Sequence, residues 1–231
     1  MRILPYRAID DSVDGVVITF FDITKVVEGE LLGTLVDELN HRVRNMLQLV
    51  SAIASHTLRR ADSLEDFGKI FTGRIKALAV AHELVSRSGW RDVPLLDLIE
   101  KELRPYATGD GRLVTEGALV CLKPAAALCL GMILHEMATN AAKHGALSVD
   151  TGRICVNWRR ENVDGAEHLV LRWRESGGQN LTAAPQRRGF GSELMERQLH
   201  YDLKGKLEVD YDEAGLRIMI AVPVDVIADG S

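Results

Sequence analysis

The sequence of 231 residues has few cysteines, no excess of positive charge and no apolar run long enough to cross a bilayer. Its three cysteines, Cys121, Cys129 and Cys155, form no C-x-x-C pair and leave one over in any disulfide scheme, which indicates a reducing compartment. With 28 basic and 33 acidic residues the formal net charge is −5, which argues against nonspecific nucleic-acid binding. The longest apolar run, 124–134, is too short for a membrane span, so we expect a cytoplasmic protein without a membrane segment.

Three site signatures with fixed spacing are also absent. His135-Glu136 begins like the H-E-x-x-H zinc motif, but Thr139 stands where the second histidine ligand belongs. The sequence has no G-x-x-x-x-G-K-[ST] loop, and Gly189-Phe190-Gly191 lacks the third glycine of a dinucleotide-binding turn. Zinc hydrolysis is therefore excluded, and any ATP site must hold the phosphates in another way.

The apolar pattern predicts helices in the first part of the chain. A strand-like run at 15–21 leads into a helical pattern over 31–58. A second helical pattern follows Asp62-Ser63, a plausible N-cap, and runs to residue 84. Two long helices joined by a short turn predict an antiparallel hairpin, which ends at a linker over 86–89.

Beyond this linker, helices and strands mix without strict alternation. We expect a short helix over 94–103, a strand hairpin over 113–115 and 118–122, a long helix over 124–143, strands over 153–160 and 168–174, a helix over 192–201 and a last hairpin over 206–211 and 216–223. The predicted fold class is α+β: a two-helix antiparallel hairpin followed by an α/β sandwich, in which helices cover a mixed sheet.

The long helix carries one polar stripe in an otherwise apolar sequence. Glu136, Asn140 and Lys143 align on a 3.6-residue period, while nearly every other position from 125 to 142 is apolar. Burying these groups costs free energy unless each finds a partner, and a nucleotide with Mg²⁺ can supply partners for all three. A solvated stripe fits the same spacing, so two interpretations stay open at this point.

Two glycine-rich segments follow the long helix. Glu175-Ser176-Gly177-Gly178 comes after a predicted strand, and Gly189-Phe190-Gly191 precedes a predicted helix. Glycines allow the backbone to approach a flat ring or phosphates closely, and helix N-termini favour anions. Each segment taken alone indicates no more than a turn.

In combination and in this order, these motifs resemble those of sensor histidine kinases. Residues 134–148 resemble the N box, and Trp173-Arg174-Glu175 is similar to the W-x-E of the first glycine box in the HWE subfamily. Gly189-Phe190-Gly191 resembles the second glycine box, and residues 39–45 resemble the phosphoacceptor box of that subfamily. Ahead of these motifs, residues 15–24 resemble the last strand and the D-I-T tripeptide of a PAS sensor domain.

The resemblance implies a kinase core of the GHKL, or Bergerat, type in three parts. Residues 1–29 would be a PAS remnant and signalling linker, 30–89 a dimerisation and histidine phosphotransfer hairpin, and 90–231 the ATP-binding domain. Such a core phosphorylates itself from Mg-ATP and then phosphorylates an aspartate of a response-regulator receiver domain. The implied partners are an upstream PAS or other sensor module and a possible second copy bound through the hairpin.

The resemblance also assigns the site residues. It makes His41 the phosphoacceptor, Asn140 the Mg²⁺ ligand, Glu136 a catalytic carboxylate and Glu175 the residue that recognises adenine. The implied ATP-binding set is Asn140, Lys143, Glu175, Gly177, Gly189 and Gly191.

The phosphoacceptor box departs from the wider family in one position. His41 lies on the helix face opposite the apolar stripe, so we expect it to be exposed to solvent. Most histidine kinases have an acidic residue directly after the acceptor histidine, but Arg42 stands here. Asp37 and Glu38, one turn earlier, are therefore the candidate bases for the ring proton.

Two alternatives to the kinase are kept. One is a histidine phosphotransfer or scaffold protein with the same fold and no working ATP site. The other is an ATPase of the gyrase and chaperone type, in which Glu136 activates water, although this gives no reason for His41 on its helix.

Overall fold

The computed structural model describes residues 2–7, 13–19, 40, 43–59, 61–178, 199–212 and 215–228. The chain divides into two compact units, Met1–Ser55 and His56–Ser231. All side-chain geometry that bears on the predicted site lies in the second unit. The predicted domain boundaries at 29/30 and 89/90 stay predictions.

The first unit contains a two-stranded antiparallel sheet of β1 (Arg2–Arg7) and β2 (Val13–Thr19). The strand predicted at 15–21 overlaps β2, whereas β1 was not predicted. Residues 43–58 are helical, as expected, and the remainder of the helix predicted over 31–58 lies largely outside the described residues. The resemblance of the N-terminal segment to a PAS domain stays a prediction.

Helix α2 (Leu64–Arg87) begins where its sequence predicts. The Ser63 hydroxyl accepts a hydrogen bond from the Asp66 backbone N–H at 3.1 Å and so caps the helix. Glu65 and Asp66 place negative charge in the first turn, where the helix dipole favours it. The buried face of α2 packs against helices α3 (Leu95–Leu103) and α4 (Pro124–Lys143).

The main sheet has five strands in the order β4-β6-β7-β9-β8. These strands are β4 (Leu113–Gly117), β6 (Arg153–Val163), β7 (Ala166–Ser176), β9 (Gly215–Pro223) and β8 (Lys206–Asp212). β4 runs parallel to β6, and the other neighbouring pairs are antiparallel. The sheet is therefore mixed, as predicted, and the strands expected at 153–160, 168–174, 206–211 and 216–223 are all present.

The prediction that residues 113–115 and 118–122 form a hairpin is wrong. β4 pairs with β6, while β5 (Cys121–Leu122) pairs with β3 (Val93–Pro94) in a separate two-stranded sheet. Trp158 of β6 lies against the end of β4, where a Cβ on Gly117 would come within 2.3 Å of its ring. Its indole N–H also donates to the Ala118 carbonyl at 2.8 Å. The Trp158 contacts hold the end of β4 against β6, and the chain then leaves the main sheet.

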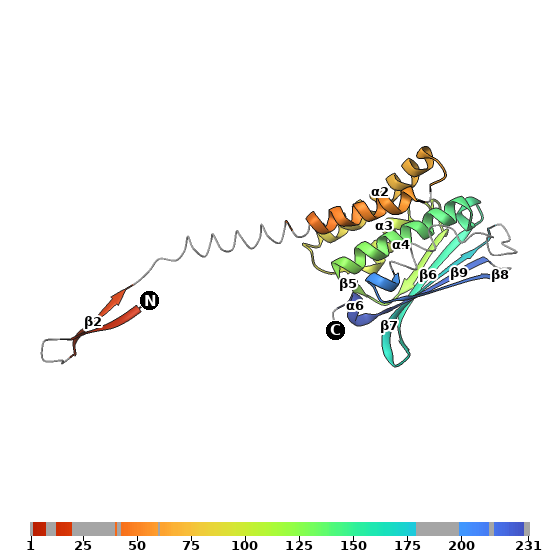
Figure 1. Cartoon of the computed structure of the whole chain (residues 1–231). Helices are drawn as coiled ribbons and strands as arrows, with labels where there is room; N and C mark the ends of the chain where they lie inside the picture. Colours follow the sequence, from red (N-terminus) through yellow and green to blue (C-terminus); the bar gives the residue numbers. More distant parts are fainter. Residues whose placement is uncertain are drawn as a thin grey trace. The chain divides into compact units, whose positions relative to one another are not determined.

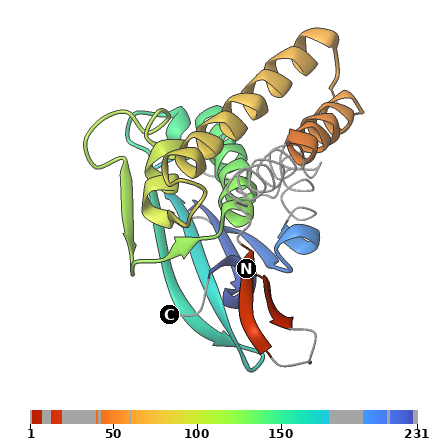
Figure 2. The same cartoon turned by 90° about the vertical axis from the view of Figure 1, so that its left-hand side faces the viewer.

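Helix α4 has the bounds predicted from its sequence, with Pro124 in its first turn. The helices lie on one face of the five-stranded sheet (Figure 1 and Figure 2), and most residues of α4 are buried. Among the described helices, α4 alone is long and apolar enough to pass a test for a membrane span, but 67% of the tested window is buried inside the protein. It is therefore the core helix of this unit. The single turns η1 (Ala146–Ser148) and α6 (Val224–Ile227) are also present, and residues 199–202, at the end of the helix predicted over 192–201, are helical.

The packing around α4 can be tested at Leu134, which has no exposed surface. We expect Leu134→Ala to lower the free energy of unfolding by about 2–5 kcal/mol, because it removes buried methyl groups and leaves a cavity. Leu119→Ala is the matched control: its side chain is 82% exposed, and its effect should stay within about 0.5 kcal/mol. Urea titration followed by circular dichroism measures both variants, and equal effects would contradict the assignment of α4 to the core.

Candidate functional site

The polar stripe of α4 leaves the protein core at its C-terminal end. Glu136 is largely buried, with 12% of its side chain exposed, whereas Asn140 and Lys143 are exposed. The stripe was expected to be either buried with partners or solvated, and each interpretation holds for part of it. Glu136 has a partner within the protein, and the side chains of Asn140 and Lys143 face solvent without a hydrogen bond to another described residue.

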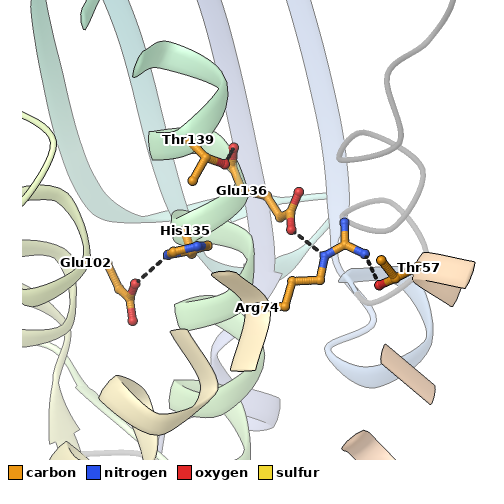
Figure 3. Close-up of polar contacts among 6 residues, drawn as sticks. All are labelled: Thr57, Arg74, Glu102, His135, Glu136 and Thr139. Atoms are coloured by element: carbon orange, nitrogen blue, oxygen red, sulfur yellow. Dashed lines mark hydrogen bonds and ion pairs between the residues drawn. The ribbon is translucent and has the colours of Figure 1, made fainter. Parts of the chain in front are cut away.

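The partner of Glu136 is Arg74, which reaches it from α2 (Figure 3). Arg74 Nε donates to Glu136 Oε1 at 2.6 Å, and Arg74 Nη1 donates to Thr57 Oγ1 at 2.9 Å. The Arg74 side chain is only 3% exposed, so this ion pair is shielded from water. Arg74 thus connects the end of the helix over 43–58 to the polar stripe of α4.

The residue next to Glu136 points to a different helix. His135 Nδ1 lies 3.3 Å from Glu102 Oε2 of α3, and the Tyr106 ring meets the imidazole edge-on with centroids 5.8 Å apart. Burial raises the pKa of Glu102 above its ordinary value, and the hydrogen bond and charge of His135 oppose this rise. The other carboxylate oxygen, Oε1, is buried and has no hydrogen-bond partner in the described part of the chain. Figure 3 shows that His135 and Glu136 point away from each other, His135 toward Glu102 and Glu136 toward Arg74.

Sequence reasoning missed both Arg74 and Glu102, although each leaves a signal. Both residues occupy positions on the buried faces of their helices, among apolar neighbours. A charged residue in such a position requires a partner, because an unpaired buried charge is costly. The pattern therefore predicts that a partner exists without identifying it.

A cavity of about 750 Å³ lies beside the His135 pair, between α2 and the end of α3. Gly68, Gly73 and Tyr106 are part of its lining, and a Cβ on Gly73 would come within 3.5 Å of His135 Nε2. None of the predicted ATP-binding residues in the described part of the chain lines it. The cavity is therefore separate from the site that the motifs predict.

The segment after α4 is fastened to the end of β7. The Gly145 backbone N–H donates to the carbonyls of Asn140 and Ala141, both at 3.1 Å, and so closes the last turn of α4. The next N–H, that of Ala146, donates to Glu175 Oε2 at 2.6 Å. Burial raises the pKa of Glu175, and the hydrogen bonds from Ala146 and Trp173 oppose this rise.

The turn that follows β7 requires a glycine at residue 177. Its φ of 71° lies in the left-handed region, and a Cβ there would come within 2.7 Å of the Thr151 carbonyl oxygen. The other predicted site residues, His41, Asp37, Glu38, Gly189 and Gly191, lie outside the described residues. The structure thus places Glu136, Asn140 and Lys143 on one helix and links Glu175 to the end of that helix through Ala146.

Comparison with known proteins gives a family match over part of the chain and relatives that match most of it. Residues 38–118 match the HWE histidine kinase family. A blue-light-activated histidine kinase of Brucella ovis is 31% identical over 205 residues, which make up 88% of this chain and 42% of that protein. The corresponding protein of Brucella anthropi is 32% identical with the same coverage. Residues 38–118 are thus a segment of the HWE histidine kinase type, and over 205 residues the chain is similar to these histidine kinases.

The fold agrees with solved histidine kinases. The blue-light-activated histidine kinase EL346 of Erythrobacter litoralis superposes with a TM-score of 0.61 and 18% identity, over 80% of this chain and 60% of that one. The histidine kinase domain of the same protein gives a TM-score of 0.51 and 20% identity, over 78% and 96% of the two chains. At these identities the likeness shows the fold alone. The chain spans 42% of the length of the curated relatives named above.

The ion pair between α2 and α4 can be tested by removing one or both partners. We expect Arg74→Met to destabilise the protein by about 3–5 kcal/mol, because it leaves the largely buried Glu136 carboxylate unpaired. The double variant with Glu136→Met should recover much of this loss, since neither charge then remains.

Urea titration measures the free energy of unfolding of the wild type, of Arg74→Met and of the double variant. Lys69→Met serves as the control. Lys69 also lies on α2 and pairs with Glu65, but both side chains are more than 70% exposed, so its loss should change stability little. If Arg74→Met behaves like Lys69→Met, the Arg74–Glu136 pair does not hold α2 against α4.

Proposed function

We propose that this chain is the phosphotransfer core of a sensor histidine kinase, which phosphorylates His41 from Mg-ATP and passes the phosphoryl group to an aspartate of a response-regulator receiver. One observation carries the proposal. Helix α4 presents Asn140 and Lys143 to solvent immediately before a loop that is fastened to the first glycine box. The family match over 38–118 includes the segment that resembles the phosphoacceptor box.

The donor set at the end of α4 fits a nucleotide with its metal. The amide oxygen of Asn140 suits Mg²⁺, which is bound by few protein groups when phosphates complete its coordination. This agrees with the described residues, which contain no cluster of three or more His, Cys, Asp or Glu side chains able to hold a metal. Bound Mg²⁺ would neutralise phosphate charge, and Lys143 would pair with a phosphate oxygen. Backbone N–H groups at Gly177, Gly189 and Gly191 complete the proposed cradle.

His41 is the proposed nucleophile: its ring nitrogen would bond to the γ-phosphorus while the bond from that phosphorus to the β,γ-bridging oxygen breaks and ADP leaves. Asp37 or Glu38 accepts the proton from its ring, because Arg42 cannot. Glu136 is the further candidate carboxylate, and Arg74 fixes its position one turn before Asn140. Most of the rate enhancement then comes from positioning and from electrostatic stabilisation of the transferred group. The adenine role of Glu175 stays a prediction.

The remaining proposals follow from the family. The chain would work in the cytoplasm as part of a protein with a PAS or other sensor module, with the residues up to 29 as the linker. The hairpin over 30–89 would carry His41 and bind a second copy, and the residues from 90 onward would bind ATP.

The phosphoacceptor is tested by incubating the protein with γ-labelled ATP and Mg²⁺. We expect acid-labile label on the wild type and none on His41→Ala, while both bind ATP equally by calorimetry. Binding is kept because the proposed nucleotide contacts all lie beyond residue 135. His200→Ala is the control, since His200 is exposed and has no proposed role.

Three other results each exclude the proposal in a different way. Label that persists in His41→Ala moves the acceptor to another residue. Release of labelled phosphate without labelled protein favours the ATPase alternative. A wild type that binds no nucleotide favours a phosphotransfer or scaffold protein, whose His41 is charged from a phosphorylated receiver.

Asn140→Asp tests the proposed metal ligand. We expect it to abolish autophosphorylation, because it places a second carboxylate one turn from Glu136 and changes the charge around Mg²⁺. Circular dichroism should barely change, since the Asn140 side chain is exposed and bonds to no described residue. Asn162→Asp is the matched control: this side chain already accepts a hydrogen bond from Gly165, and a carboxylate can accept it too. Normal labelling of Asn140→Asp removes the assigned role.

A further inference from the structure

Arg112, the residue before β4, donates to three backbone carbonyls of one loop. Its Nε donates to the Gly152 carbonyl at 3.1 Å, and its Nη2 donates to the carbonyls of Leu147 at 3.2 Å and Val149 at 2.6 Å. These acceptors lie in the 147–152 loop, which leads from η1 to β6. Because the donors of a guanidinium are fixed in one plane, the three carbonyls that bind it are held in one arrangement.

The hydrogen bonds within the 147–152 loop are long. The Val149 N–H donates to the Ala146 carbonyl at 3.4 Å, and the Gly152 N–H donates to the Val149 carbonyl at 3.2 Å. Both exceed the usual distance of about 2.9–3.0 Å. Leu147 and Gly152 are buried, so their carbonyls need a donor within the protein. Arg112 supplies a donor to both, and the shape of the loop therefore depends on a residue outside it.

The 147–152 loop contacts the first glycine box. Thr151 Oγ1 donates to the Gly177 carbonyl at 3.1 Å. The backbones lie close as well, because a Cβ on Gly177 would come within 3.5 Å of the Gly152 Cα. The loop also packs against the segment after α4, since a Cβ on Gly152 would come within 1.7 Å of the Ala146 carbonyl oxygen. The position of the loop thus restrains the backbone of the turn at Gly177.

We propose that Arg112 is a positioning residue for the nucleotide. It holds the 147–152 loop so that Thr151 bonds to Gly177, whose backbone N–H belongs to the proposed phosphate cradle. Because its Nε and Nη2 already donate to the loop carbonyls, Arg112 acts through the loop. The inference rests on the nucleotide site put forward above. It adds to the roles proposed there for Lys143 and Glu175 and changes neither.

The test asks whether Arg112 and Thr151 act through the same contact. ATP with Mg²⁺ is titrated by calorimetry into the full chain, Arg112→Ala, Thr151→Val and the double variant. We expect Thr151→Val to weaken ATP by about three- to tenfold and Arg112→Ala by about tenfold or more, because they lose one and three hydrogen bonds. The double variant should bind as Arg112→Ala does, within about twofold, since the Thr151 contact is already lost there.

The outcomes of this cycle are distinct. If the two losses multiply in the double variant, Arg112 and Thr151 act independently and the positioning role is overturned. It is also overturned if Thr151→Val binds ATP as the wild type does. This variant keeps the proposal testable even if Arg112→Ala fails to fold, because the Thr151 residue is exposed.

Two further variants separate the shape of the side chain from its charge. Arg112→Lys keeps the charge but lacks the planar set of donors, so it should bind ATP nearly as weakly as Arg112→Ala. Wild-type affinity in Arg112→Lys would overturn the proposal, because a positive charge alone would then suffice. Arg87→Ala is the control and should bind as the wild type does, since its side chain is 72% exposed at the end of α2.

Hydrogen exchange at the Gly152 amide gives a readout that needs no nucleotide. We expect exchange at least about tenfold faster in Arg112→Ala than in the wild type, with the far-ultraviolet circular dichroism unchanged. Equal protection in both chains overturns this inference and leaves the proposed function intact. A wild type that binds no ATP overturns the proposed function, and the nucleotide role of Arg112 with it.

Discussion

Helix α4 is buried over most of its length, and this burial limits what its polar residues can do. A charge in such a position is stable only with a partner, so Glu136 is met by Arg74 from α2. His135, the adjacent residue, is met by Glu102 from α3. Because the two neighbours point to different helices, they fix the rotation of α4 and its contacts with both. The last turn leaves the core, and Asn140 and Lys143 are exposed there.

The exposed end of α4 is held from the opposite side of the fold. The helices fix its middle, whereas the sheet fixes its end through the bond from Ala146 to Glu175. The metal ligand proposed above, Asn140, needs support on both sides, since small displacements of a binding group cost affinity and rate. Asn140 lies between these two restraints. The buried pairs and the loop contact therefore serve the same end, although they share no residue.

The fold could be predicted from the sequence wherever the signal is local. Pro124 and the apolar run after it give the bounds of α4, and Ser63 gives the start of α2. The pairing of β4 was predicted wrongly, because its partner begins about forty residues further along the chain and a parallel pairing leaves no turn to recognise. Arg74 and Glu102 show the same limit in the site. A charge on an apolar face predicts a buried partner, but the identity of that partner depends on how the helices pack.

Glu175 of the W-x-E motif can be explained both by the resemblance to related kinases and by its contacts in this structure. The motif places an acid where related kinases use one for adenine, and in the structure Glu175 lies within the last residues of β7, shortly before Gly177. The spacing has a second cause in this structure, because residues two apart on a strand share a face and Trp173 can donate to Glu175. Once both oxygens have buried donors, the acid is needed for the fold of the loop whether or not a nucleotide is bound. Glu175 therefore has a structural role in this loop, beside the adenine role that the resemblance predicts.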